Sequence, residues 1–239
     1  MKRWADNDLV YDDDLSELVT SANLTFANAA ARDAFLVGSI APVPGTTVYM
    51  KDDGITYTYV MVGGTGSWAP APGTLISGVG FGSTYQSMGS AGVPTLVAIP
   101  GIAQYSRNLN NAYNVTTSRF NPQVPGIYEI SGQVASTVPA PYDGYRSAWL
   151  CLNNSVPGSA DASTIPGSRN QFWPSVSVSS MVTVATKEIC CYLNGSSDYV
   201  TLWAMHSASA GITIGGSVYA TNAGSSYYDT SLTAKYLGM

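Results

Sequence analysis

The sequence is poor in charge. Only 10% of its 239 residues are Asp, Glu, Lys or Arg, against roughly 25% in typical soluble domains. The formal net charge of −5 arises mainly in residues 1–20, which hold six acids and two bases, whereas from residue 76 onward six acids and six bases cancel. No stripe of Lys and Arg is present, which argues against a nucleic-acid-binding protein.

Long apolar runs are also missing. No stretch approaches the roughly 18 apolar residues that mark a membrane-spanning helix. Lys2 and Arg3 are followed by Trp, Asp and Asn rather than by the apolar segment of a signal peptide. We therefore expect a protein that is made in the cytoplasm without a secretion signal and that does not insert into a membrane.

Histidine and cysteine are scarce. The three cysteines, Cys151, Cys190 and Cys191, do not form a disulfide framework, and we expect them to be small buried hydrophobic residues in strands. No Cys/His group has zinc spacing. His206, the single histidine, lies in the apolar stretch VTLWAMHSAS, which favours a packed position over a role in a catalytic triad, and no Gly-X-Ser-X-Gly motif is present.

Paired carboxylates could still hydrolyse glycosidic bonds. The acids of the C-terminal part are scattered singly, and each is expected to form a turn or to face solvent: Glu129, Asp143, Asp161, Glu188, Asp198 and Asp229. We expect no catalytic residue, no metal ligand and no cofactor. The sequence leaves calcium binding open, although no dense Asp cluster argues for it.

Hydrophobic residues are abundant, at 45%, so the chain can form a packed core. From residue 95 to the end, short strand-like segments alternate with turns rich in Gly, Pro and Asn, which predicts an antiparallel all-β domain. The expected strands are 95–100, 118–123, 126–136, 146–153, 175–185, 187–194, 198–207, 212–221 and 230–238. The Gly/Ser-rich residues 76–94 are expected to form a linker or a first strand.

The first 75 residues differ in pattern. Residues 27–37 are Ala-rich and predict a short helix that ends at Gly38. Residues 47–62 predict a hairpin with a type I′ turn at Asp53-Gly54, and Trp68 follows on a further short strand. We expect residues 21–75 to form a small helix-plus-β-meander module.

Residues 1–20 form an acidic segment whose apolar side chains need a partner surface, because twenty residues cannot bury them alone. A frayed tail is the alternative. The apolar residues that would anchor this segment to a partner are Trp4, Leu9, Val10, Tyr11, Leu15 and Leu18.

Residues 105–135, YSRNLNNAYNVTTSRFNPQVPGIYEISGQVA, resemble the central motif of the complement globular-head and tumour-necrosis-factor superfamily of jelly rolls. The matching positions are Asn111, Tyr113, Asn114, Thr116, Phe120, Pro122, Pro125, Gly126 and Tyr128. Asn153-Asn154, the turn 193–200 and the closing segment 230–239 are also similar to the family. The resemblance implies a jelly-roll head over residues 95–239 that assembles as a homotrimer.

Residues 1–75 have Trp-Ala-Asp-Asn-Asp near their start and contain an Ala-Ala-Arg-Asp helix and a Gly-Ser-Trp-X-Pro meander. These features are similar to N-terminal regions of phage tail-fibre and head-fibre proteins, especially of actinobacterial phages. This resemblance implies a homotrimeric protein of the virion surface, with residues 1–20 as the virion anchor on another virion protein and an outward head. The lack of catalytic motifs makes a non-enzymatic role the expectation. Our leading hypothesis is a trimeric tail fibre or minor tail protein that adheres to the host envelope. A capsid-mounted head fibre or decoration protein, and an envelope-degrading depolymerase, are the alternatives.

Aromatic loops are the expected receptor contacts, because Tyr and Trp offer a large contact area at little entropic cost and stack on sugars. The alternative is that these side chains pack the ends of the sandwich or a subunit interface. The candidates for binding a host glycan or protein are Tyr142, Tyr145, Arg146, Arg169, Phe172, Trp173, Tyr227 and Tyr228.

Overall fold

The structure is a computed structural model of the chain. It describes residues 24–39, 41–62, 64–80, 85–99, 107–137, 143–156, 163–174, 181–215, 217–218, 227–228 and 230–239. The chain divides into two compact units with the boundary between Thr74 and Leu75. The expected anchor segment 1–20 lies outside the described residues, so its role stays a prediction. Within the described part of the chain, no helix is long and apolar enough to span a membrane.

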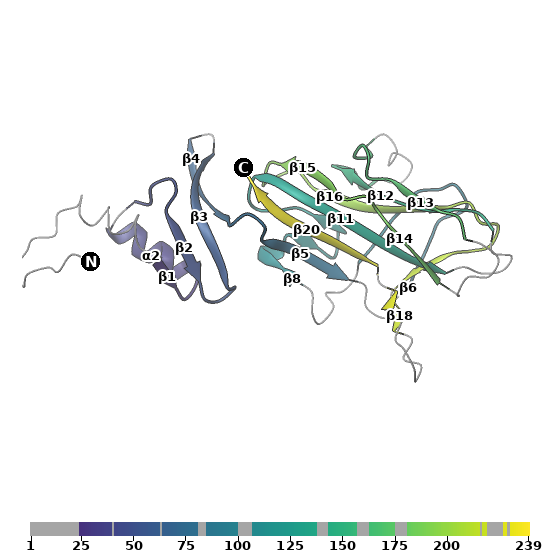
Figure 1. The fold of residues 1–239 in the computed structure, drawn as a ribbon, viewed down its shortest axis with the longest axis horizontal. Coiled ribbons are helices and arrows are strands. Elements are labelled where there is room, and N and C mark those ends of the chain that lie inside the picture. Colours follow the sequence, from purple (N-terminus) through teal and green to yellow (C-terminus); the bar gives the residue numbers. More distant parts are fainter. Residues whose placement is uncertain are drawn as a thin grey trace, which may run out of the picture. The chain divides into compact units, whose positions relative to one another are not determined.

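The N-terminal unit is a four-stranded sheet with one helix. Its strands lie in the order β1 (Leu24–Phe26), β2 (Thr47–Met50), β3 (Ile55–Val62) and β4 (Thr65–Pro70) (Figure 1). The helix α2 (Ala29–Ser39) connects β1 to β2, which pair in parallel, whereas the other neighbours are antiparallel. A crossover helix between parallel strands is the usual solution, because a parallel pair cannot be joined by a tight turn.

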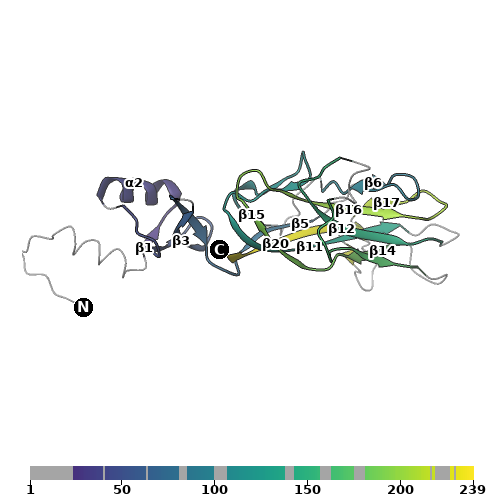
Figure 2. The same ribbon diagram turned by 90° about the horizontal axis from the view of Figure 1, so that it is seen from above.

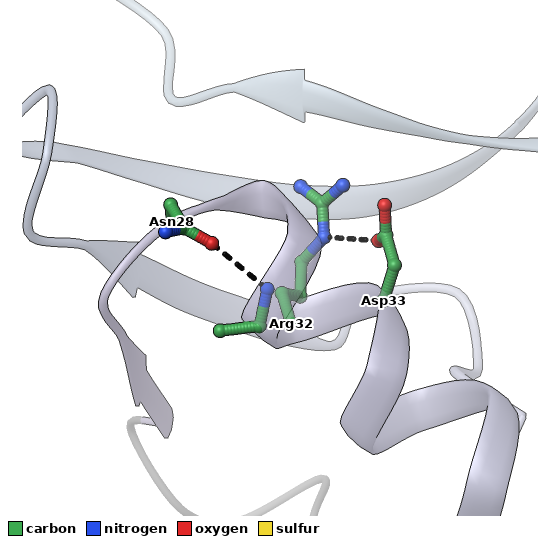
Figure 3. A network of polar contacts seen from close by, with 4 residues as sticks. Asn28, Arg32 and Asp33 are labelled. Carbon is green, nitrogen blue, oxygen red and sulfur yellow. Dashed lines mark hydrogen bonds and ion pairs between the residues drawn. The ribbon is translucent and has the colours of Figure 1, made fainter.

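Asn28 begins the helix as an N-cap. Its side-chain Oδ1 accepts a hydrogen bond from the backbone N–H of Ala31 at 2.9 Å, one of the amides that a helix start leaves unpaired (Figure 3). Arg32 is buried, its guanidinium lies 4.8 Å from the ring centroid of Trp68, and its Nε lies 2.7 Å from Asp33. The prediction that Gly38 ends the helix was wrong, since α2 continues to Ser39.

The predicted hairpin is present, but its turn differs. Residues 51–54 separate the last pair of β2 and β3, Met50 and Ile55. Only Gly54 has a positive φ, of 70°, whereas a type I′ turn needs two such residues. The Asp53 carboxylate instead accepts hydrogen bonds from the Ile55 amide (2.9 Å) and the Tyr57 hydroxyl (2.7 Å). The acid therefore stabilises a wider loop than the sequence predicted.

The C-terminal unit contains two large sheets. The six-stranded sheet has the order β13-β12-β16-β10-β9, with β7 paired to β16. Its strands are β7 (Thr95–Leu96), β9 (Tyr113–Asn114), β10 (Arg119–Phe120), β12 (Arg146–Leu152), β13 (Asn170–Phe172) and β16 (Val200–His206). A 3-10 helix, Leu109–Asn111, precedes β9.

The eight-stranded sheet has the order β6-β17-β11-β20-β5-β8, and both β14 and β15 pair with β11. Its strands are β5 (Leu75–Gly80), β6 (Tyr85–Ser87), β8 (Arg107–Asn108), β11 (Gly126–Thr137), β14 (Met181–Ala185), β15 (Ile189–Leu193), β17 (Thr213–Gly215) and β20 (Ser231–Gly238). A further pair joins β18 (Ser217–Val218) to β19 (Tyr227–Tyr228). The Gly/Ser-rich residues 76–94 thus contribute β5 and β6 to this sheet.

Successive long strands alternate between the two sheets. β10 lies in the six-stranded sheet, β11 in the eight-stranded sheet, β12 and β13 in the first again, β14 and β15 in the second, β16 in the first and β20 in the second. The strands β11, β12, β16 and β20 run alongside one another in both views (Figures 1 and 2). This connectivity defines an antiparallel jelly-roll sandwich, so the all-β fold class expected from the sequence is confirmed.

Aromatic side chains fill the space between the sheets. Phe120 of β10 and Tyr128 of β11 meet edge to face with ring centroids 5.7 Å apart, and Tyr128 meets Tyr236 of β20 at 5.4 Å. Phe120 and Tyr128 come from opposite sheets and meet in the core between them. The Tyr128 hydroxyl donates to the Val124 carbonyl at 2.6 Å, which satisfies its polar end.

Candidate binding surfaces

The two turns that resemble the family motif lie together at one end of the sandwich. The Asn153 side chain donates to the Asp198 carboxylate (2.9 Å) and accepts from the Tyr199 amide (2.8 Å). Asn194 Oδ1 accepts from the amides of Ser196, Ser197 and Asp198 at 2.9–3.0 Å. The carboxylate of Asp198 is therefore engaged in turn formation, as the sequence predicted for the scattered acids.

Asp143 and Glu129 are also engaged in contacts within the sandwich. The Asp143 carboxylate accepts hydrogen bonds from the Ser209 amide. The Ser209 side chain, and to a smaller extent its amide, hold the Asp143 pKa below the usual value by hydrogen bonding. Glu129 pairs with Lys235 at 3.4 Å. Among the described residues, no three His, Cys, Asp or Glu side chains gather into a possible metal site.

His206 is packed, as expected, and is 2% exposed. Its Nε2 lies 2.8 Å from the Gly89 carbonyl oxygen.

Arg146, expected to contact a receptor, is also 2% exposed. Leu202 of β16 faces Gly132 of the other sheet, and Leu150 of β12 lies opposite Leu202 in register. Because strand side chains alternate, Arg146 points to the same inward side of β12 as Leu150. Arg146 is thus turned into the sandwich and is not available as a surface contact in this structure.

Four expected receptor residues lie around the edge strand β13. Phe172 is opposite Arg146 in register, and Trp173 directly follows the strand. Trp173 is 64% exposed, and its ring meets that of Tyr145 edge to face at 5.4 Å. The Arg169 guanidinium lies 4.1 Å from the ring centroid of the buried Trp149. The structure therefore brings Tyr145, Arg169 and Trp173 to one edge of the six-stranded sheet.

The remaining candidates are placed less fully. Tyr142 lies outside the described residues. Tyr227 and Tyr228 form β19, whose backbone pairs with β18, and nothing further is described for their side chains. Receptor binding by any of these residues stays a prediction.

A second surface, which the sequence analysis missed, lies on the outward side of β11 and β15. Tyr128, Ile130, Ile189 and Leu193 are buried, so the alternate residues Ile127, Glu129, Cys190 and Tyr192 face outward. Ile127 and Tyr192 are directly opposite in register and are 40% and 56% exposed. We call these four residues the β11–β15 face.

The β11–β15 face carries little net charge, because Glu129 is paired with Lys235. Cys190 is exposed, which corrects the expectation that all three cysteines are buried, whereas Cys151 is buried and Cys191 is half-buried. Burial raises the Cys191 pKa to about 11. The signal for this face was present in the sequence: in GIYEIS and EICCYL both alternating sets contain apolar residues, whereas a solvated sheet face is polar.

Comparisons with known proteins give no family. No family model matches the chain, and no curated protein matches it. A similar solved structure is the Eiger TNF from S. frugiperda, with 11% identity and a TM-score of 0.37 over 69% of this chain and 93% of that chain. A similarity at this level assigns neither a family nor a function, and the jelly-roll description rests on the strand order itself.

Proposed function

We propose that this chain is a non-enzymatic bacteriophage virion protein, a trimeric tail fibre or minor tail protein whose jelly-roll head binds the host surface. The observation that carries the proposal is the β11–β15 face. Large apolar side chains that are exposed side by side on paired strands mark a contact with another protein. The resemblance of residues 105–135 to a trimeric jelly-roll superfamily supports a second copy of the chain as the occupant.

A closed three-fold ring suits this face. In a cyclic trimer each copy presents two different surfaces, so the β11–β15 face of one copy packs on another part of its neighbour. The rim ion pair of Glu129 with Lys235 leaves no unpaired charge among the four residues of the face, which lowers the desolvation cost of assembly. Stable interfaces bury about 800 Å² per partner, so neighbouring residues of the eight-stranded sheet join the contact.

A binding role, rather than catalysis, is supported by how the described acids are used. Glu129, Asp143 and Asp198 each engage a cation, a backbone amide or an amide side chain. Their hydrogen bonds serve loops and turns of the sandwich.

Immunogold labelling of intact particles tests the location. Antibody against residues 95–239 is expected to decorate the tail tip, and purified protein is expected to reduce phage adsorption in competition. Gold on the capsid shell would instead identify a head decoration protein. Absence of the protein from every particle, or release of sugars from host envelope by the purified chain, would contradict the proposal.

A further inference from the structure

The edge strand β13 and the residues on either side of it present a row of three exposed side chains, at every second position. Asn170, Gln171 and Phe172 pair with Ala148, Ser147 and Arg146. Arg169, Gln171 and Trp173 are all exposed and follow at intervals of two residues. Side chains at i, i+2 and i+4 of a strand point to the same side, spaced by about 6.6 Å at about 3.3 Å per residue.

Two ring contacts show on which side of the six-stranded sheet these side chains lie. Trp149 belongs to a buried cluster with Cys151 and Trp203, which lies on the side of the six-stranded sheet opposite to Leu150 and Leu202. Arg169 lies over Trp149, and Trp173 meets Tyr145, which shares the side of Trp149 by alternation. The row of Arg169, Gln171 and Trp173 therefore lies on the outer side of the sandwich; we call it the β13 row.

We propose that the β13 row is a glycan-binding subsite, in which one sugar ring stacks on Trp173 and the next sugar hydrogen-bonds to Gln171. The proposal rests on the function proposed above and names its ligand class and its site. An indole that is 64% exposed is an apolar platform for the C–H face of a sugar. Its edge-to-face contact with Tyr145 restricts the orientation of the ring.

The polar side chain in the middle of the row suits the same ligand. Gln171 offers both a donor and an acceptor group, which matches sugar hydroxyls. Arg169 stacks the face of its guanidinium on the Trp149 ring at 4.1 Å, and this contact fixes the end of the row next to Gln171.

A protein partner fits the row less well. Protein interfaces need a broad apolar centre, whereas the row offers one indole, and the neighbouring Phe172 points to the other side of β13. Addition of an extended peptide to the edge of the sheet is limited by the three-residue length of β13, because short edge strands offer few backbone hydrogen bonds. A narrow line with one aromatic platform and one hydrogen-bonding side chain suits a linear glycan.

The full-length chain, fluorescently labelled, should be applied to an array of purified bacterial capsular, lipopolysaccharide and cell-wall polysaccharides. We expect at least one polysaccharide to be retained, and its affinity to fall about tenfold or more with Trp173→Ala and several-fold with Gln171→Ala. Trp173→Tyr, which keeps a platform, should recover part of the affinity. Phe172→Ala is the matched control on the other side of β13 and should change affinity less than about twofold.

Several outcomes would overturn this assignment. These are no retention on any printed polysaccharide, retention that Trp173→Ala leaves unchanged, and retention that survives periodate oxidation of the sugars. If the chain is trimeric and blocks adsorption but none of its binding depends on Trp173, the glycan subsite fails while the proposed function stands. If the glycan binds through Trp173 but the chain is absent from particles, the proposed function fails and the subsite stands.

Discussion

Arg146 and His206 lie directly opposite each other on the central strands β12 and β16, and both are 2% exposed. The Arg146 Nη1 donates to the carbonyl oxygens of Asp143, Gly144 and Tyr145 at 3.2–3.4 Å. Its Nε and Nη2 have no hydrogen-bond partner among the residues that the structure describes. Because a carbonyl oxygen only accepts, the His206 Nε2 next to Gly89 must carry a proton. The Arg146 guanidinium is thus held inside the sandwich by three backbone carbonyl groups.

The first prediction tests whether the volume of the Arg146 side chain or its charge and hydrogen bonds determine its contribution to stability. Burial lowers the Arg146 pKa, while Asp143 opposes that shift, so the environment does not favour the cation. Arg146→Ala should lower the free energy of unfolding by about 2–4 kcal/mol because it leaves a cavity. Arg146→Met, which keeps much of the volume, should cost less than about 1 kcal/mol. Urea unfolding measures both, and equal losses would show that the carbonyl hydrogen bonds dominate.

The second prediction concerns alkaline pH. Burial, together with the charge of the neighbouring Tyr236, raises the Tyr128 pKa, and burial also raises the Tyr236 pKa. The folded state therefore retains protons that the unfolded chain loses above a pH of about 10. Stability should be constant with respect to these groups below that pH and should fall as pH rises beyond it.

Urea midpoints at pH 8 to 11 test this behaviour. Tyr128→Phe should cost about 1 kcal/mol at pH 8, because it removes the hydrogen bond to Val124, and should flatten the alkaline decline. An unchanged slope in that variant would show that Tyr128 is not the group responsible.

The third prediction concerns thiol reactivity. Cys190 is exposed on the β11–β15 face, whereas Cys151 is buried and the Cys191 pKa is raised to about 11. At pH 8 with reductant removed, iodoacetamide should modify Cys190 first, because thiolate content and access set the rate. If the β11–β15 face is a subunit contact, this reaction should slow at micromolar protein and quicken on dilution. A rate independent of concentration would place the contact elsewhere.

The fourth prediction uses two glycines with similar backbone angles. Gly195 (φ 72°) and Gly167 (φ 81°) both occupy the left-handed region. A Cβ at Gly195 would lie 2.4 Å from the Pro125 nitrogen, whereas a Cβ at Gly167 would meet nothing within 4 Å. Gly167→Ala should therefore cost only the backbone strain, about 1–2 kcal/mol, and Gly195→Ala should cost clearly more. Thermal unfolding of the two variants checks the difference, and equal losses would contradict the close approach at Pro125.

The sequence predicted the sandwich because short strand-like segments alternate with turns rich in Gly, Pro and Asn. It also predicted that His206 is packed, since the residue lies in an apolar strand. It did not predict the β11–β15 face, because strand order is needed to place Ile127 opposite Tyr192. Arg146 was expected on the surface from its place in an aromatic loop, and only the pairing with β16 shows that it points inward.

Local geometry explains the smaller errors. Gly38 does not end α2, because glycine lowers helix propensity by only about 1 kcal/mol and the helix continues to Ser39. The hairpin turn at Asp53 is wider than predicted, since the carboxylate bonds the Ile55 amide and the Tyr57 hydroxyl. These side-chain hydrogen bonds are not visible in a residue pattern.

Light scattering of the full-length chain in solution tests the central claim most directly. At micromolar concentration we predict a mass three times that of the 25.0 kDa chain. Tyr192→Asp should reduce the mass to that of one chain while leaving the β-sheet circular-dichroism spectrum unchanged, because it places a charge on the β11–β15 face. A single-chain mass for the unaltered protein, or a trimer that tolerates Tyr192→Asp, would contradict assembly through this face.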